Sequence, residues 1–153
     1  MIKRIIITIM CFALIASVVV GLTGCGVFIQ MAFDNQEYNY YLNDKDGFIS
    51  VTAVITEYRD VTSKHGEKRI MLDFDDDVPG FCVDVFKIED ANRRVVRKNG
   101  FEKLVKPGTE ITFISNPYYF GNGYIFPVVG LSVGDVVLLD FEEGYENLLE
   151  SYR

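Results

Sequence analysis

The chain has 153 residues, of which 15 are basic and 22 acidic, so its formal net charge at neutral pH is −7. A chain of this length forms about one domain and can bury a core. Because phosphate backbones and anionic lipid headgroups are bound by Lys and Arg, the acidic balance argues against a nucleic-acid partner and against electrostatic docking on a membrane.

The first 25 residues have the pattern of an export signal. Lys3 and Arg4 precede an uncharged apolar run over residues 5–20, which is typical of a secretory signal peptide, although an uncleaved transmembrane helix is the alternative for such a run. The next residues are Leu22-Thr23-Gly24-Cys25, an apolar residue and two small residues before a cysteine. This segment resembles the lipobox of bacterial lipoproteins. The resemblance implies cleavage before Cys25 and a diacylglycerol on its thiol.

The resemblance divides the chain into a signal peptide (residues 1–24), a lipidated tether (25–46) and one domain (47–153). Two acyl chains anchor a protein stably, since each buried CH₂ contributes about 0.8 kcal/mol, so we expect an extracytoplasmic protein whose membrane contact is the lipid at Cys25. Removal of residues 1–24 leaves 13 basic and 22 acidic residues, a net charge of −9. Cys82 is then the one cysteine without lipid, which excludes an intramolecular disulfide, and we expect it to be a buried small hydrophobe.

Alternating apolar and polar residues predict strands in the first half of the domain. The segment from Phe48 to Val61 predicts one long, bent strand. A polar turn over residues 63–67 joins it to a second strand over residues 70–74, so the two read as a hairpin. After the turn at residues 75–80, a third strand is expected from Phe81 to Ile88.

Helices and further strands follow. Residues 89–98 carry acidic residues first and basic residues last, which suits a helix dipole, and Asn99-Gly100 ends the helix. Residues 110–115 alternate as a strand, residues 118–130 read as a hairpin around Gly121-Asn122-Gly123, and residues 136–139 form a short strand. A C-terminal amphipathic helix is expected from Phe141, with Asp140 and Glu143 resembling a capping box.

The order of these elements indicates a mostly β fold. Three meandering strands, a helix, and then two or three further strands over residues 47–139 resemble an oligonucleotide/oligosaccharide-binding (OB) barrel, which has its helix between strands three and four. The resemblance rests on element order alone and implies a small antiparallel β-barrel. Another small, mostly antiparallel barrel or sheet is the alternative.

Residues 73–77 contain the densest acidic cluster, with Asp75 and Asp77 as weak candidates for a metal site. The Pro-Gly that follows favours a solvated loop instead. His65 is the single histidine, so a typical zinc site lacks ligands, and we expect no cofactor. The basic group Arg93, Arg94, Arg97 and Lys98 is expected to be a solvated helix face rather than an anion site.

The most informative segment is residues 116–127, in which five aromatic rings surround the Gly-Asn-Gly tip. In an OB-like barrel it would join strands four and five, a common ligand-binding edge, and its aromatic faces suit a glycan, a peptide or an apolar anchor. The candidate binding residues are Tyr118, Tyr119, Phe120 and Tyr124. At least two rings among Tyr118, Phe120 and Tyr124 are expected to be exposed, unless the segment only caps the barrel.

These observations predict a membrane-tethered, non-enzymatic binding or interaction module with a protein or glycan partner. Two alternatives are open. The first is a metal-assisted hydrolase that uses the acidic cluster over residues 73–77, and the second is an envelope-assembly component with no small ligand.

Overall fold

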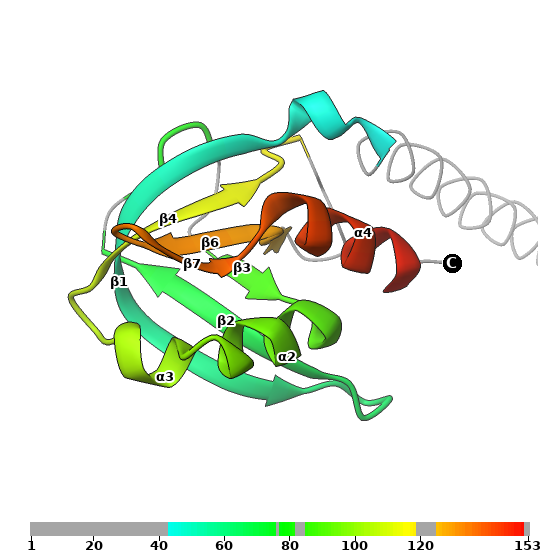
Figure 1. Cartoon of the computed structure of the whole chain (residues 1–153), viewed down its shortest axis with the longest axis horizontal. Coiled ribbons are helices and arrows are strands. Elements are labelled where there is room, and N and C mark those ends of the chain that lie inside the picture. Colours follow the sequence, from blue (N-terminus) through cyan, green and yellow to red (C-terminus); the bar gives the residue numbers. More distant parts are fainter. Residues whose placement is uncertain (1–42, 76, 82–84, 119–124, 152–153) are drawn as a thin grey trace, which may run out of the picture. The chain divides into compact units, whose positions relative to one another are not determined.

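The computed structural model describes residues 43–75, 77–81, 85–118 and 125–151. The chain divides into two units, Met1–Asn39 and Tyr40–Arg153, and every described residue belongs to the second. Its elements are η1 (Lys45–Gly47), β1 (Ile49–Thr62), β2 (Lys68–Phe74), β3 (Val85–Ile88), α2 (Asp90–Lys98), α3 (Phe101–Leu104), β4 (Glu110–Ser115), β5 (Phe126–Pro127), β6 (Gly130–Val133), β7 (Val136–Leu139) and α4 (Phe141–Ser151). The fold is mostly β (Figure 1). No described helix has both the length and the apolar character needed to span a membrane.

The longest strand, β1, organises the sheet. Residues 49–54 pair antiparallel with β4, whereas residues 55–62 pair with β2. The register shifts between Ile55 and Glu57, and such an irregularity bends a strand and increases its twist. β1 therefore curves along the whole sheet (Figure 1), which confirms the long, bent strand and the β1–β2 hairpin that the sequence predicts.

The seven strands in the described part of the chain form one mixed sheet in the order β5-β3-β2-β1-β4-β6-β7. β5 runs parallel to β3, with Phe86 opposite Phe126 and Lys87 opposite Pro127, while the other ladders are antiparallel. The described residues form a small, mostly antiparallel sheet, which is the alternative that the sequence left open; the expected antiparallel barrel is not confirmed, because one ladder is parallel and the sheet is not closed into a barrel. The tip and most of the first arm of the expected hairpin over residues 118–130 lie outside the described residues; in its described part, residues 126 and 127 pair with β3 and Gly130 pairs with β4.

The segment between β5 and β6 connects two distant parts of this sheet. The Val128 N–H donates to the carbonyl oxygen of Lys87 in β3 at 2.8 Å, and the Val129 N–H donates to that of Ile114 in β4 at 2.9 Å. In the strand order, β2 and β1 lie between β3 and β4. The sheet must therefore curl until β3 and β4 approach one another.

Phenylalanine rings fill the interior of the curled sheet. The set comprises Phe74, Phe81, Phe86, Phe113 and Phe126. The centroids of Phe86 and Phe113 are 4.7 Å apart, and those of Phe81 and Phe126 are 4.9 Å apart, both pairs meeting edge to face. Such contacts add to the free energy of burial. These rings come from β2, β3, β4, β5 and the β2–β3 loop, so their contacts join these four strands in one core.

Helix α2 confirms the helix expected over residues 89–98. It contacts β2, β7 and α4, and its apolar side is buried through Val96. Gly100, at a φ of +95°, ends the helix in a conformation that favours glycine. The short helix α3 follows directly and was not predicted, because its four residues are too few to show a period. Phe101 of α3 is fully buried.

Helix α4 confirms the expected C-terminal helix, and it approaches the sheet unusually closely. A Cβ on Gly144 would lie 2.0 Å from the carbonyl oxygen of Val129, well inside van der Waals contact. The helix begins as the capping pattern predicts, although the Asp140 carboxylate accepts from the Glu142 N–H, at 3.0 Å, rather than from Glu143. Because Gly144 has no side chain, α4 packs directly against the segment between β5 and β6.

Replacement of Gly144 tests this seating. An exposed helical Gly→Ala change stabilises a helix by roughly 1 kcal/mol, but here the new methyl group would overlap a backbone oxygen that cannot rotate away. We expect Gly144→Ala to lower the free energy of unfolding by about 3 kcal/mol, measured by urea denaturation. Glu143→Ala, at an exposed neighbour in the same helix, is the control and should change it by less than about 0.5 kcal/mol.

Candidate functional site

The aromatic segment is described at its two ends. Tyr119, Phe120 and Tyr124 lie outside the described residues, so the prediction of at least two exposed rings stays a prediction for Phe120 and Tyr124. Tyr118 is 59% exposed, whereas Phe126 is fully buried. The segment therefore contributes to the core at one end and presents a ring to solvent at the other, which combines the two readings that the sequence left open.

The base of this loop is buried and hydrogen-bonded. The Ser115 hydroxyl donates to the carbonyl oxygen of Pro127 at 2.7 Å, which ties the two ends of the loop together. Asn116 is fully buried, and its Oδ1 accepts from the Tyr118 N–H at 2.9 Å. The backbone of Tyr118 is thus held from below by a buried amide while its ring lies at the surface.

Three segments meet around this base. Ile49 pairs with Ser115 in the β1–β4 ladder, and a Cβ on Gly80 would lie 3.3 Å from the Ile49 Cδ1 atom, which brings in the β2–β3 loop. A Cβ on Gly47 would lie 3.0 Å from the Asn116 amide nitrogen and 3.1 Å from an Asp44 carboxylate oxygen. We use the name loop-end rim for six of the exposed or partly exposed residues of these segments: Asp44, Asp46, Ile49, Asp77, Phe81 and Tyr118.

Lys45 lies beside this rim but is engaged by α4. Its ammonium donates to Glu142 and lies 5.5 Å and 5.6 Å from the ring centroids of Phe141 and Tyr145. The hydrogen bond to Glu142 raises the pKa of Lys45, and burial raises the pKa of Tyr145. Lys45 therefore stays protonated at neutral pH, and its charge is matched by Glu142 rather than by the carboxylates of the rim.

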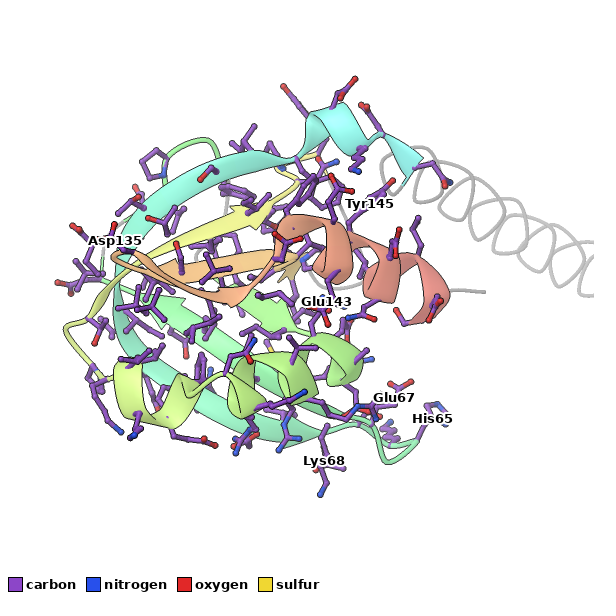
Figure 2. The ribbon with its side chains drawn as sticks, viewed as in Figure 1. His65, Glu67, Lys68, Asp135, Glu143 and Tyr145 are labelled. Carbon is purple, nitrogen blue, oxygen red and sulfur yellow. The ribbon has the colours of Figure 1, made fainter. Side chains whose placement is uncertain are left out.

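The acidic cluster does not assemble a metal site in the described residues. The Asp73 carboxylate accepts from the Arg59 guanidinium at 2.9 Å and 3.2 Å. Asp75 and Asp77 are exposed, and Asp76 is outside the described residues. No group of three or more His, Cys, Asp or Glu side chains in the described ranges could hold a metal ion. His65 lies at the β1–β2 turn, pointing outward beside Glu67 and Lys68 (Figure 2).

The basic helix face is paired within the domain. Arg93 contacts Asp60 at 3.1 Å, Arg97 pairs with both Asp60 and Glu102, and Arg94 pairs with Asp90 at 3.0 Å. These partners come from β1, α3 and α2 itself. The pairing neutralises the arginines of this face, so the geometry gives no support to an anion site there.

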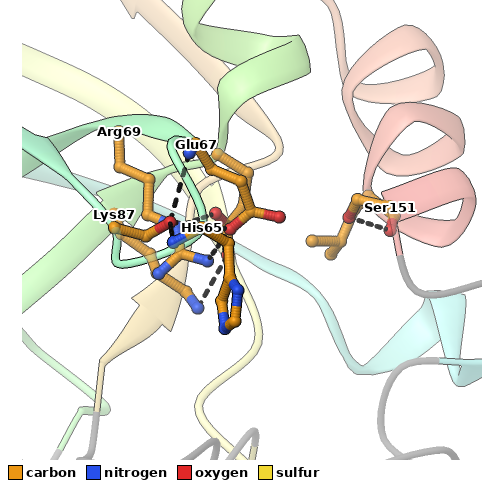
Figure 3. Close-up of polar contacts among 8 residues, drawn as sticks. His65, Glu67, Arg69, Lys87 and Ser151 are labelled. Atoms are coloured by element: carbon orange, nitrogen blue, oxygen red, sulfur yellow. Dashed lines mark hydrogen bonds and ion pairs between the residues drawn. The ribbon is translucent and has the colours of Figure 1, made fainter.

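A second polar cluster, centred on Glu89, was missed from the sequence. Its side chain is only 9% exposed and pairs with Arg69 of β2 and Lys87 of β3, both at 2.7 Å, while Arg69 also pairs with Glu67 at 2.8 Å. Figure 3 shows Glu67, Arg69 and Lys87 gathered beside His65. Two acidic and two basic groups balance one another, so the cluster stabilises the start of α2. The sequence does contain one signal for this ion-pair cluster: Lys87 and Glu89 are two residues apart, so in an extended segment their side chains lie on the same side.

Removal of the Ser115 hydroxyl tests the base of the loop. Ser115→Ala leaves the Pro127 carbonyl buried without this donor, so we expect the free energy of unfolding to fall by about 1–2 kcal/mol. Chemical denaturation measures the change. Ser50→Ala, at an exposed position of β1, is the matched control. Equal losses in the two variants would contradict the assignment.

Cys25 and Cys82 lie outside the described residues, so their predicted roles rest on the sequence. In comparisons with known proteins, no family model, no curated protein and no solved structure matches this chain.

Proposed function

We propose that the chain is an extracytoplasmic lipoprotein, held on a membrane by lipid at Cys25, whose domain is a binding or interaction module. The observation that carries the binding role is the placement of Tyr118. Its ring is 59% exposed on a backbone that buried groups hold in place. An exposed tyrosine offers a large amphipathic contact surface with only two side-chain torsions to order on binding, so this arrangement suits recognition.

The proposed lipid anchor on a membrane is supported by the order of features in the first 25 residues. A basic start, an uncharged apolar run and Leu22-Thr23-Gly24-Cys25 succeed one another, as in lipoprotein signal peptides. The lipid would leave the domain on the outer face of the membrane. The partner is then another envelope component or a molecule that reaches that face.

The domain is proposed to be a partly open, OB-like barrel. Three features support this reading: β1, β2 and β3 form a meander, α2 and α3 lie between β3 and β4, and residues 126–133 pair first with β3 and then with β4. In such barrels the loop between the fourth and fifth strands is a ligand-binding edge. The loop that carries Tyr118 occupies this place.

The geometry favours this role over a metal-assisted hydrolase. Asp73 is engaged by Arg59, and the described residues bring no third metal ligand to Asp75 and Asp77. A catalytic carboxylate needs a partner group within reach of a substrate. An exposed ring that contacts a partner has no such requirement.

Labelling with palmitate tests the anchor. We expect wild-type protein to incorporate labelled palmitate and Cys25→Ser to incorporate none, because the thiol is the atom that accepts the lipid. Cys82→Ser is the control and should be labelled like the wild type. Equal labelling of Cys25→Ser and wild type would overturn the anchor.

Photo-crosslinking in cells tests the binding module. A benzoyl-phenylalanine replacing Tyr118 should give a discrete adduct, whereas the same group replacing His65, an exposed residue of the β1–β2 turn, should not. Tyr118→Ala should shift the melting temperature by no more than about 2 °C, since exposed substitutions change stability little. Adducts from both positions or from neither would contradict a site at Tyr118.

A further inference from the structure

The sheet has a charged half and an uncharged half. The charged half consists of residues 57–62 of β1 with β2 and β3, and its charged side chains are Glu57, Arg59, Asp60, Lys68, Arg69, Asp73 and Lys87. The uncharged half consists of residues 49–54 of β1, residues 111–115 of β4, and β6 and β7, which contain no Asp, Glu, Lys, Arg or His. Both halves belong to one sheet, so each serves as a comparison for the other.

The outer side of the uncharged half carries side chains that the ladders bring into register. Directly opposed residues have their side chains on the same face of a sheet. Thr52 is opposite Thr112, Thr112 is opposite Ser132, and Ser132 is opposite Val137, so these residues form one row across four strands. The alternate residues face the core: Val51, Ile111, Phe113 and Leu131. We use the name uncharged face for six exposed or partly exposed residues of the outer side: Ser50, Thr52, Thr112, Ile114, Ser132 and Val137.

Contacts within the uncharged face confirm that these side chains share one surface. The hydroxyl oxygens of Thr52 and Thr112 are 2.8 Å apart and share a hydrogen bond. A Cβ on Gly130 would lie 2.8 Å from the Cδ1 atom of Ile114, so the isoleucine side chain lies across its glycine neighbour in β6. Val137, at the end of the row, is 59% exposed. The face therefore combines hydroxyl groups with apolar surface and carries no charge.

The charged half of the same sheet shows what a solvent-facing surface of this protein looks like. Its outer side carries an ion pair between Arg59 and Asp73 at 2.9 Å, and surfaces in water ordinarily intersperse charges of both signs. The uncharged half has no such pair, and the nearest carboxylate in its ladders is Glu110, opposite Val54 at the margin. Because the centres of protein interfaces are depleted of charged residues, the uncharged face has the composition of an interface.

The chemistry of the uncharged face favours a second copy of this chain as the partner. A hydroxyl both donates and accepts a hydrogen bond, and apolar side chains pack against their own kind, so each group of the face is complementary to itself. A twofold interface sets the same patch of two subunits against one another, whereas an acidic surface would repel its copy. A neutral glycan would find no aromatic ring among these six residues, and an anionic lipid surface would find no cation.

We propose that the uncharged face is a homodimer interface, in which two copies of the chain meet sheet against sheet. The hydroxyls of the central row would bond to those of the other copy, and Val137 would be removed from water. This inference goes beyond the proposed function, because it concerns a surface that does not include Tyr118 and needs no ligand at that residue.

Photo-crosslinking between two tagged forms of the full-length chain tests the interface. Both forms are produced in the same cells, and both carry benzoyl-phenylalanine in place of Val137. We expect a product that has the mass of two chains and contains both tags. The matched control carries the same group in place of Val61, which is 42% exposed and lies in the charged half of the sheet. It should not give the doubly tagged product.

A charge introduced on the face separates a specific interface from mere proximity. With benzoyl-phenylalanine at position 137, Thr52→Lys places an unpaired ammonium between the two copies, so we expect the yield of the doubly tagged product to fall about tenfold. Thr62→Lys adds the same charge at an exposed position of the charged half and should lower the yield less than about twofold, because distant charges are screened. Both threonines are exposed, so the melting temperatures of the two variants should agree within about 2 °C.

Any of four results would overturn the homodimer. An adduct at position 137 that contains only one tag would identify a different protein or a lipid on this face. Equal yields of the doubly tagged product from positions 61 and 137 would reflect crowding of the chains rather than an interface. A yield that Thr52→Lys leaves unchanged, or the absence of any product, would mean that the face stays in water. The crosslink from position 118 is measured separately, so the proposed function would stand in each case.

Discussion

The two hydrogen bonds of Val128 and Val129 are the constraint on which the rest of the structure depends. Consecutive Cα atoms are only about 3.8 Å apart, yet these two amides donate to strands that are separated by two others in the sheet. The sheet can satisfy both amides only when it curls. The curl encloses the phenylalanine rings, and it exposes the Val129 carbonyl to the close approach of α4 at Gly144.

A single buried amide joins the helices to the same segment. Asn92 of α2 donates from Nδ2 to the carbonyl oxygens of Gly144 at 2.9 Å and Val128 at 3.4 Å, and its Oδ1 accepts from Asn147 at 2.9 Å. A buried polar group with its partners in place favours one arrangement over others, because any shift leaves it unsatisfied. The positions of α2, α4 and residues 128–129 relative to one another are therefore coupled. The loop that carries Tyr118 begins and ends on this coupled core.

The elements that could be predicted from the sequence are those whose signal is local. β1, β2, β4, α2 and α4 show their periods over six or more residues, the short strand β7 follows a turn signal at residues 132–135, and the structure confirms all six. The parallel pairing of β5 depends on a contact between residues 86 and 126, which no local period reveals. The Glu89 cluster was missed for a related reason: its partner Arg69 comes from another strand. The candidate loop was found by its composition, but which ring is buried depends on the curl of the sheet.

Asn116 and Tyr118 invert the usual distribution of polar and apolar groups. The hydrophobic effect alone would bury the ring and expose the amide, yet Asn116 is fully buried and Tyr118 is 59% exposed. The hydrogen bond from the Tyr118 N–H to Asn116 Oδ1 compensates part of the desolvation of the amide. It also fixes the backbone that carries the ring. Phe126, at the other end of the same loop, follows the ordinary rule and is buried. One aromatic residue of the loop therefore serves the core while another lies at the surface beside a buried amide, so the aromatic composition of the segment does not by itself decide which ring is exposed.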